Sequence, residues 1–343
     1  MTRPRRFLEV ADLTPALLTE ALDRAVAGKA DPASVPRVLD GQGAALLFEK
    51  PSARTRSSTE MAVVSLGGHP IYIRPDEVGL GERESVPDVG RTLACYCALI
   101  AARVFDHATL ETMADAVDVP VVNLLSDRAH PCQAVADVLT LREALGALAG
   151  CRLVYVGDGN NVAASLAFAA AMTGVELTVA SPPGYELDDD VIARARNLGG
   201  TVEVTNEPGD AVKGADAVYT DVWTSMGQED EAAVRRAAFA GFAVDTTLME
   251  LAGPQARFMH CLPAHRGEET EDAVIDGPAS IVWAQAANRL HAVRAVISLL
   301  VAPGTAGTAG TPDPSGASGA SSAPGAPGAP GASGASGAGA GGR

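Results

Sequence analysis

The sequence has little of what a disulfide-stabilised, zinc-binding or membrane-spanning protein needs. It contains five cysteines among 343 residues, an odd number without a CxxC pair, which argues against a disulfide framework or a zinc knuckle. No apolar run is long enough to cross a bilayer, and the basic start MTRPRRFLEV lacks the apolar segment of a signal peptide. We therefore expect reduced thiols and a cytoplasmic protein without a membrane partner.

Basic residues are also in deficit. The chain has 26 Lys and Arg residues against 42 Asp and Glu residues, a formal net charge of −16, and such a charge repels polyanions. This disfavours nucleic acid as the main partner. Any site for a small anion must be built locally from arginine, histidine and backbone dipoles.

What the sequence does have is the composition and alternation of a two-domain α/β protein. It is 47% hydrophobic and 20% charged, and apolar runs alternate with helical patterns, which is typical of parallel sheets. In the first half, strands are expected at 44–48, 70–73, 98–105 and 119–125, and helices at 54–66, 86–97, 107–116 and from the end of HPCQ (130–133) to Gly146. In the second half, strands are expected within 152–161, 175–180, 201–205, 217–223 and 257–263.

This alternation predicts two open, mainly parallel-sheet α/β domains, joined by helices, with a cleft between them at the carboxyl ends of the strands. The boundaries expected are 1–146 for the first domain and 147–285 for the second, with a helix over 286–301 that returns to the first domain. Residues 302–343 are rich in Gly, Ala, Ser and Pro. A collagen-like period of glycine is interrupted there at Asp313 and Ser322, so we expect a disordered tail.

The stretch FEKPSARTRSSTE (48–60) places Arg54 and Arg56 just after Ser52, at an expected helix start. A solvated helix end is one interpretation. The other is an anion site, because Ser52 can cap the helix, free backbone N–H groups point outward, and arginine can hold two phosphate oxygens.

Other polar residues follow predicted strands. Arg103 closes the strand at 98–105, and His130 with Gln133 opens the helix after 119–125. A single histidine is more often structural than functional, but these residues together with SARTR would converge on one crevice.

FEKPSARTR, Arg103, HPCQ, DVWTSMG (221–227) and HCLP (260–263), in this order, resemble the aspartate/ornithine transcarbamylase family, and within it the ornithine carbamoyltransferases. The resemblance covers about residues 5–301. It implies a transferase that makes L-citrulline and phosphate from carbamoyl phosphate and L-ornithine in arginine biosynthesis, as a homotrimer and without a metal or organic cofactor.

The resemblance also implies the site residues. Those for carbamoyl phosphate, in the first domain and on the last helix, are Ser52, Ala53, Arg54, Thr55, Arg103, His130, Pro131, Cys132, Gln133, Cys261, Leu262 and Arg289. Those for ornithine, in the second domain, are Asn161, Asp221, Ser225 and Met226. Arg54, Arg103, His130 and Cys261 are implied as catalytic. Arg56 is expected to be structural, and Leu262–Pro263 is a candidate cis bond.

Three residues depart from the family pattern. Ala53 stands where Gly or Thr is usual, Ala287 where Glu is common, and Gly79 where a Gln or His often reaches carbamoyl phosphate in a neighbouring subunit. We expect weaker carbamoyl phosphate binding because of Gly79, unless Arg83 or a backbone N–H compensates.

Two alternatives stay open. One is a transcarbamylase for acetylornithine or putrescine, and another is a catalytically silent regulatory paralogue. A dinucleotide site at VYVGDGNN is disfavoured because GxGxxG is absent.

Overall fold

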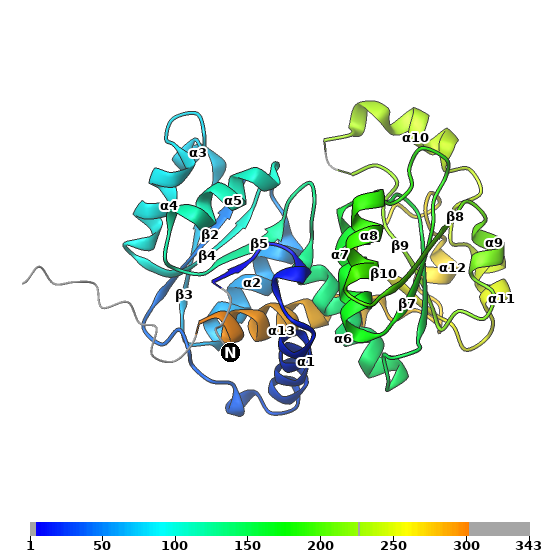
Figure 1. The fold of residues 1–343 in the computed structure, drawn as a ribbon, viewed down its shortest axis with the longest axis horizontal. Helices are drawn as coiled ribbons and strands as arrows, with labels where there is room; N and C mark the ends of the chain where they lie inside the picture. The colour runs from blue at the N-terminus through cyan, green and yellow to red at the C-terminus, as the bar shows by residue number, and fades with distance from the viewer. Residues whose placement is uncertain (1–4, 226, 302–343) are drawn as a thin grey trace, which may run out of the picture. The chain divides into compact units, whose positions relative to one another are not determined.

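The structure is a computed structural model and describes residues 5–225 and 227–301. It contains two five-stranded parallel sheets, which confirm the expected fold class (Figure 1). The sheet of the first domain has the order β1-β5-β4-β2-β3, and that of the second domain β10-β9-β6-β7-β8. The strands of the first are β1 (Arg6–Phe7), β2 (Gly43–Phe48), β3 (His69–Ile73), β4 (Cys97–Arg103) and β5 (Val121–Leu125). Those of the second are β6 (Arg152–Val156), β7 (Glu176–Ala180), β8 (Thr201–Thr205), β9 (Ala217–Thr220) and β10 (Arg257–His260).

Helices connect the parallel strands, as their topology requires. In the first domain they are α1 (Pro15–Ala30), α2 (Ala53–Ser65), α3 (Pro75–Val78), α4 (Val86–Ala94), α5 (His107–Ala116) and α6 (Pro131–Leu145). In the second they are α7 (Asn161–Thr173), α8 (Asp189–Asn197), α9 (Pro208–Ala211), α10 (Ala232–Ala238), α11 (Thr246–Ala252) and α12 (Asp272–Ile275). Within residues 5–225 and 227–301, short 3-10 helices lie at Val10–Asp12, Pro32–Ser34 and Glu229–Glu231, and the last helix is α13 (Val282–Leu300).

Both sheets are buried on two faces, and alternate residues of a strand serve different cores. On β2, Leu46 belongs to a core cluster that also contains residues of the second domain, whereas Leu47 belongs to a cluster on the opposite face of the sheet. On β6, Tyr155 joins the shared cluster and Val154 joins a cluster confined to the second domain. The shared cluster packs the two sheets against common helices.

Helix α13 brings the end of the described chain back to the first domain. It packs on α6, α2 and α1, and Figure 1 shows it in orange beside α1 and α2. Its residues from Ala292 to Leu300 are all buried. The helix therefore carries Arg289 toward residues that are far away in the sequence.

Some expected boundaries were wrong. The strands expected at 217–223 and 257–263 end at Thr220 and His260, because the backbone leaves the sheet there. Helix α6 begins at Pro131, within HPCQ rather than after it. The tail prediction for 302–343 lies outside the described residues.

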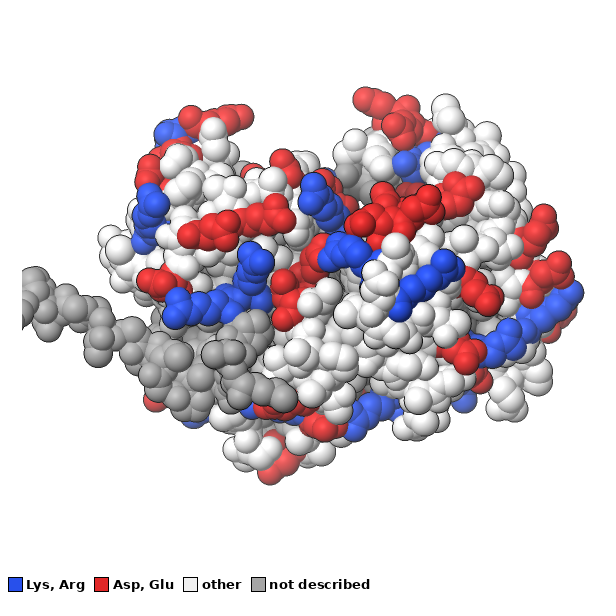
Figure 2. Space-filling model, in the orientation of Figure 1, with Lys and Arg blue, Asp and Glu red and all other residues white. Residues whose placement is uncertain are grey.

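Charge of both signs is spread over the surface. Figure 2 shows acidic and basic side chains interspersed on the face that it displays. Among the described residues, no helix is both long and apolar enough to span a bilayer.

Candidate active site

The carboxyl ends of strands from both sheets open into one cavity of about 1130 Å³. Arg103 ends β4, Asp221 follows β9 and Cys261 follows β10. The predicted site residues that line this cavity are Ser52, Ala53, Arg54, Thr55, Arg103, His130, Asn161, Asp221, Ser225, Cys261, Leu262 and Arg289. Parallel strands end at one edge of a sheet, which explains why residues so far apart in sequence meet here.

The start of α2 forms one wall of the cavity. Ser52 caps the helix: its Oγ accepts the backbone N–H of Thr55 at 3.3 Å. Oγ1 of Thr55 accepts a hydrogen bond from Nη2 of Arg289 at 2.9 Å. A capped helix start beside a buried guanidinium favours a bound anion.

Arg54 and Arg56 point to different surroundings. Arg54 is exposed and lines the cavity. Arg56 instead pairs with Glu60 at 2.8 Å and lies over the Tyr72 ring, 3.7 Å from its centroid. Arg56 thus makes structural contacts and does not line the cavity, as expected from the sequence.

Positive charge is concentrated deep in the cavity. Arg103 is 4% exposed, and burial, followed by the charges of Arg289 and Arg54, lowers its pKa to about 10. Burial and the same arginines, together with Arg103, hold the pKa of His130 well below 6.5. The imidazole is therefore neutral near pH 7. Its Nδ1 has no hydrogen-bond partner among the described residues.

Three predicted residues lie behind the cavity wall and do not line it. Pro131 is the first residue of α6 and is buried, and Cys132 donates its thiol to the carbonyl of Asn123. Gln133 is fully buried, and its side chain bonds to Arg289 and Asp137. The side chain of Gln133 reaches the cavity lining through Arg289.

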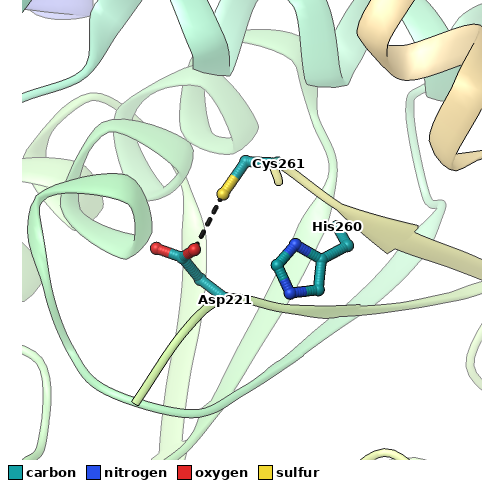
Figure 3. Close-up of side chains that lie close together, drawn as sticks. All are labelled: Asp221, His260 and Cys261. Carbon is teal, nitrogen blue, oxygen red and sulfur yellow. Dashed lines mark hydrogen bonds between the residues drawn. The ribbon is translucent and has the colours of Figure 1, made fainter. Parts of the chain in front are cut away.

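The second domain supplies a carboxylate and a thiol. Sγ of Cys261 donates to Oδ1 of Asp221 at 2.9 Å (Figure 3). Burial, then the charge of Asp221, holds the pKa of Cys261 well above its usual range, so the sulfur is a protonated thiol at neutral pH. Such a thiol is a poor nucleophile, and it donates to the carboxylate.

Other predicted residues of this domain are placed as follows. Nδ2 of Asn161 donates to the carbonyl of Ser126 at 2.6 Å, which joins the second domain to the end of β5. The backbone N–H of Ser225 donates to Oε1 of Gln228. Met226 lies outside the described residues. The Leu262–Pro263 bond is cis, as expected.

Asp221, His260 and Cys261 are close enough to suggest a metal site, but His260 is already engaged. Its Nδ1 accepts the N–H of Leu262 at 2.9 Å, and its Nε2 lies 3.3 Å from Oε1 of Glu269. Figure 3 shows its ring beside the Asp221–Cys261 pair without a hydrogen bond to it. With no free ring nitrogen, the three residues do not form a suitable ligand set.

Asn160 is among the cavity-lining residues that were not predicted from the sequence. Asn160 caps α7 by accepting the N–H groups of Val162 and Ala163, and its Nδ2 donates to Oδ2 of Asp221 at 3.0 Å. The signal was an Asn directly before a helix. Its link to Asp221 joins positions 61 residues apart, which no local pattern reveals.

The conformation around Gly79 disfavours both a larger residue at position 79 and its replacement by Arg83 as a ligand of carbamoyl phosphate. Gly79 has a φ of +56°, and a Cβ there would lie 2.8 Å from Cβ of Arg83. Arg83 itself donates to the carbonyl of Glu77 and lies 3.4 Å from Glu84. In this conformation Arg83 is bound locally, and a larger residue at position 79 is strained. The exposed Ala287 lies on α13.

Two family models match the chain. The carbamoyl-P binding domain of aspartate/ornithine carbamoyltransferase matches residues 5–143, and its Asp/Orn binding domain matches residues 149–300. The chain belongs to the aspartate/ornithine carbamoyltransferase family.

Other members of this carbamoyltransferase family are similar to this chain in sequence and in structure. An ornithine carbamoyltransferase of Acidothermus cellulolyticus is 50% identical over 303 residues, which cover 87% of this chain and 96% of the relative. The solved ornithine carbamoyltransferase of Pyrococcus furiosus has a TM-score of 0.84 at 46% identity, over 88% of this chain and 99% of that one. An N-acetyl-L-ornithine transcarbamylase structure has a TM-score of 0.78 at 31% identity, over 86% and 99%.

Proposed function

We propose that this protein is an ornithine carbamoyltransferase, which converts carbamoyl phosphate and L-ornithine into L-citrulline and phosphate. The observation that carries the proposal is one cavity with a cluster of guanidinium groups on one side and the Asp221–Cys261 pair on the other. The cluster suits a phosphorylated donor. The carboxylate suits an amino-acid acceptor that carries an ammonium group.

The phosphate binds at the start of α2. Ser52, Thr55 and the backbone N–H groups, including that of Ala53, donate to its oxygens, while Arg54 adds a planar pair of donors. Arg289 is already within hydrogen-bond distance of Thr55. Gln133, with Pro131 and Cys132 beside it, acts through Arg289 or after a local rearrangement.

The carbamoyl oxygen faces Arg103 and His130. Because the imidazole is neutral and its Nδ1 is unpartnered among the described residues, it can donate a hydrogen bond from that nitrogen. Negative charge grows on the carbamoyl oxygen when the amine attacks, so donors fixed there stabilise the transition state more than the ground state.

Ornithine binds on the second domain. Asp221 accepts from its α-ammonium, Asn161 and Ser225 donate to its α-carboxylate, and Met226 completes the site. One of the two N–H donors of the Asn161 amide is engaged by the carbonyl of Ser126, and the other can serve the carboxylate. Cys261 and Leu262 lie beside the δ-amine and the carbamoyl group.

The reaction is a nucleophilic acyl substitution. The neutral δ-amine attacks the carbamoyl carbon, the tetrahedral adduct loses phosphate with the C–O bond electrons, and the amine proton leaves to solvent or phosphate. Positioning and charge stabilisation suffice for this activated donor. Because the δ-ammonium must first lose a proton, the rate rises with pH until that deprotonation is complete.

The proposal includes a homotrimer. Arg54 lines the main cavity and also a second cavity of about 340 Å³ beside Trp283, which is 62% exposed. Large apolar side chains at Met61, Val64, Ile71 and Tyr96 are exposed as well. A neighbouring copy would cover such surfaces.

We also propose the division of the chain into a carbamoyl phosphate domain (1–146), an ornithine domain (147–285) and a returning helix (286–301). The cytoplasmic location and the role in arginine biosynthesis are proposed with it. The location rests on the odd number of cysteines, all of which are free thiols in the structure.

The rival acceptors are acetylornithine and putrescine, and the structural likeness to an N-acetyl-L-ornithine transcarbamylase favours testing the first. Neither offers Asp221 an α-ammonium. Purified protein should form citrulline with ornithine, and it should turn over the other two amines at least about a hundredfold more slowly, because a buried carboxylate would then lack a charged partner. Preference for either rival amine would overturn the proposal, and no turnover with any amine would favour a silent paralogue.

A further inference from the structure

Asp137 is a fully buried carboxylate that does not line the cavity. It lies on α6, one helical turn after Gln133. Its Oδ1 accepts from Nε2 of Gln133 and from Nε2 of Gln285, each at 2.7 Å, and its Oδ2 accepts from the hydroxyl of Tyr219 at 3.2 Å. One side chain thus joins α6, α13 and β9.

An ionised carboxylate only accepts hydrogen bonds, so it decides which way a facing amide turns. Both glutamines must present their NH₂ groups to Asp137, and both amide oxygens then face outward. Oε1 of Gln133 accepts from Nη1 of Arg289. Oε1 of Gln285 accepts from the backbone N–H of His260 at 2.9 Å.

One outward bond ends at an active-site residue, and the other ends at the residue that directly precedes one. Arg289 is the guanidinium that bonds to Thr55. His260 directly precedes Cys261, and Tyr219 comes two residues before Asp221. If either amide were reversed, its NH₂ would face another donor, and the bond to Arg289 or to His260 would be lost.

We propose that Asp137 is a positioning residue for the transfer reaction, which orients Gln133 and Gln285 so that Arg289 and the Cys261 segment are held in mutual register. The inference rests on the proposed function for its reaction, and on these contacts for its mechanism. Asp137 acts only through other groups and touches no substrate.

Orientation, rather than full negative charge, is what this role requires. Burial raises the pKa of Asp137 to about 7, against the opposing effect of its three donors and of Arg289. Arg289 faces it from α13, Tyr219 from β9, and Cys261 from the segment after β10. A protonated carboxyl can still accept both amides on Oδ1 and donate from Oδ2 to Tyr219.

This reasoning identifies an informative pair of variants. The amide in Asp137→Asn keeps an oxygen for both glutamines, and its NH₂ can donate to the hydroxyl of Tyr219. Asp137→Leu removes every acceptor. The matched control is Thr140→Val, one turn further along α6, which removes a buried hydrogen bond to Asn288 at 3.0 Å in the same helix seam but away from Gln133.

The experiment measures carbamoyl phosphate affinity by calorimetry, steady-state citrulline formation and Tm for each variant. Asp137→Leu should weaken carbamoyl phosphate binding about tenfold and lower kcat by at least as much, since one oriented hydrogen bond is lost on each side of the site. Asp137→Asn should restore both constants to within about threefold of wild type. Thr140→Val should lower Tm while its kinetic constants stay unchanged.

The proposal is wrong if Asp137→Leu lowers Tm but leaves carbamoyl phosphate affinity and kcat unchanged. It is also wrong if Asp137→Asn lowers affinity and kcat as much as Asp137→Leu does. Should Asp137→Leu not fold, Gln285→Met tests the second arm: kcat should fall about tenfold while carbamoyl phosphate binds as in wild type, and an unchanged kcat would overturn the proposal. Wild type that forms no citrulline would instead reject the proposed function. Calorimetry with carbamoyl phosphate would still test the Gln133–Arg289 arm.

Discussion

At the scale of single residues, the guanidinium groups of the cavity differ in exposure. Arg103 and Arg289 are each 4% exposed, whereas Arg54 is exposed at the cavity wall. Arg289 is held by Gln133 and Thr55 before a ligand arrives. The Arg54 side chain can turn toward the ligand. Its contribution to phosphate binding therefore depends on the planar guanidinium group and not on its charge alone.

Arg54→Lys should therefore lose most activity although the charge is kept. An ammonium cannot reproduce a two-pronged phosphate contact, and the loss of one charge-assisted bond corresponds to a fall in kcat/KM for carbamoyl phosphate of about 10- to 150-fold. The matched control is Arg56→Lys, on the same helix but outside the cavity. Steady-state kinetics near wild type for Arg54→Lys would remove this residue from the anion site.

His130 makes folding stability depend on pH. Because its pKa in the folded protein lies well below 6.5, the unfolded chain binds a proton below pH 6.5 that the folded chain does not. Stability from this residue is full above about pH 6.5 and falls as the pH drops, at up to about 1.4 kcal/mol per pH unit.

His130→Asn should remove this component. Urea unfolding of both proteins should be measured between pH 7.5 and 5. The difference between their unfolding free energies should change with pH by up to about 1.4 kcal/mol per pH unit. The comparison cancels Asp137, whose raised pKa acts in the opposite direction: stability from its neutral form is present at low pH and is lost as the pH rises toward about 7. Parallel curves for the two proteins would contradict the prediction.

Most of the residues that the sequence indicated line the cavity, but the sequence did not indicate Asp137 and Asn160, which contact them. Arg103, Asp221 and Cys261 lie near the ends of the predicted strands 98–105, 217–223 and 257–263, so their convergence follows from parallel topology. Asp137 and Asn160 could not be assigned in this way, because their partners come from other elements: Gln285 from α13 for one, Asp221 from the end of β9 for the other.

At the scale of elements, hydrophobic periodicity predicted the interiors of helices and strands better than it predicted their ends. The helix at 107–116 and the strand at 201–205 have the expected bounds. The apolar residues of AVYTDVW continue past Thr220, but the backbone stops pairing there, and Asp221 lines the cavity directly after the strand. Hydrophobicity reports burial and does not report where sheet hydrogen bonds end. Helix α1 and strand β1 were not predicted individually.

The start of α7 should couple stability to ornithine binding. Asn160→Ala removes the helix cap, at a cost of about 1 kcal/mol, and also the donor to Asp221, so KM for ornithine should rise several-fold. Asp188→Ala is the matched control, since Asp188 caps α8 through the N–H of Asp190 and does not line the cavity. Both variants should lower Tm. If their ornithine KM values are equal, Asn160 serves only the helix.

At the scale of the whole molecule, the order of the motifs along the chain predicted two domains and a cleft between them, and the structure has both. What pattern analysis could not supply is the shared core, in which residues of both sheets pack on common helices. The returning α13 belongs to this core through Val293, Val296 and Ile297, and it also carries Arg289. Assembly of the site and burial of α13 therefore depend on each other.

The end of α13 also shows how far the chain is needed. Leu299, Leu300 and Val301 are buried, whereas residues 304–343 lie outside the described residues and contain no large apolar side chain. Deleting 304–343 should leave kcat unchanged and Tm within about 1 °C of the wild-type value, because such a segment has no side chains with which to extend a core.

Deleting from residue 296 onward is the contrasting control. It removes five buried residues of α13 and the residue after it, so it should prevent stable folding. Calorimetry and size-exclusion chromatography with light scattering would measure both proteins. A fall of several degrees after the first deletion, or a loss of its oligomer, would show that the tail packs on the enzyme or joins its subunits.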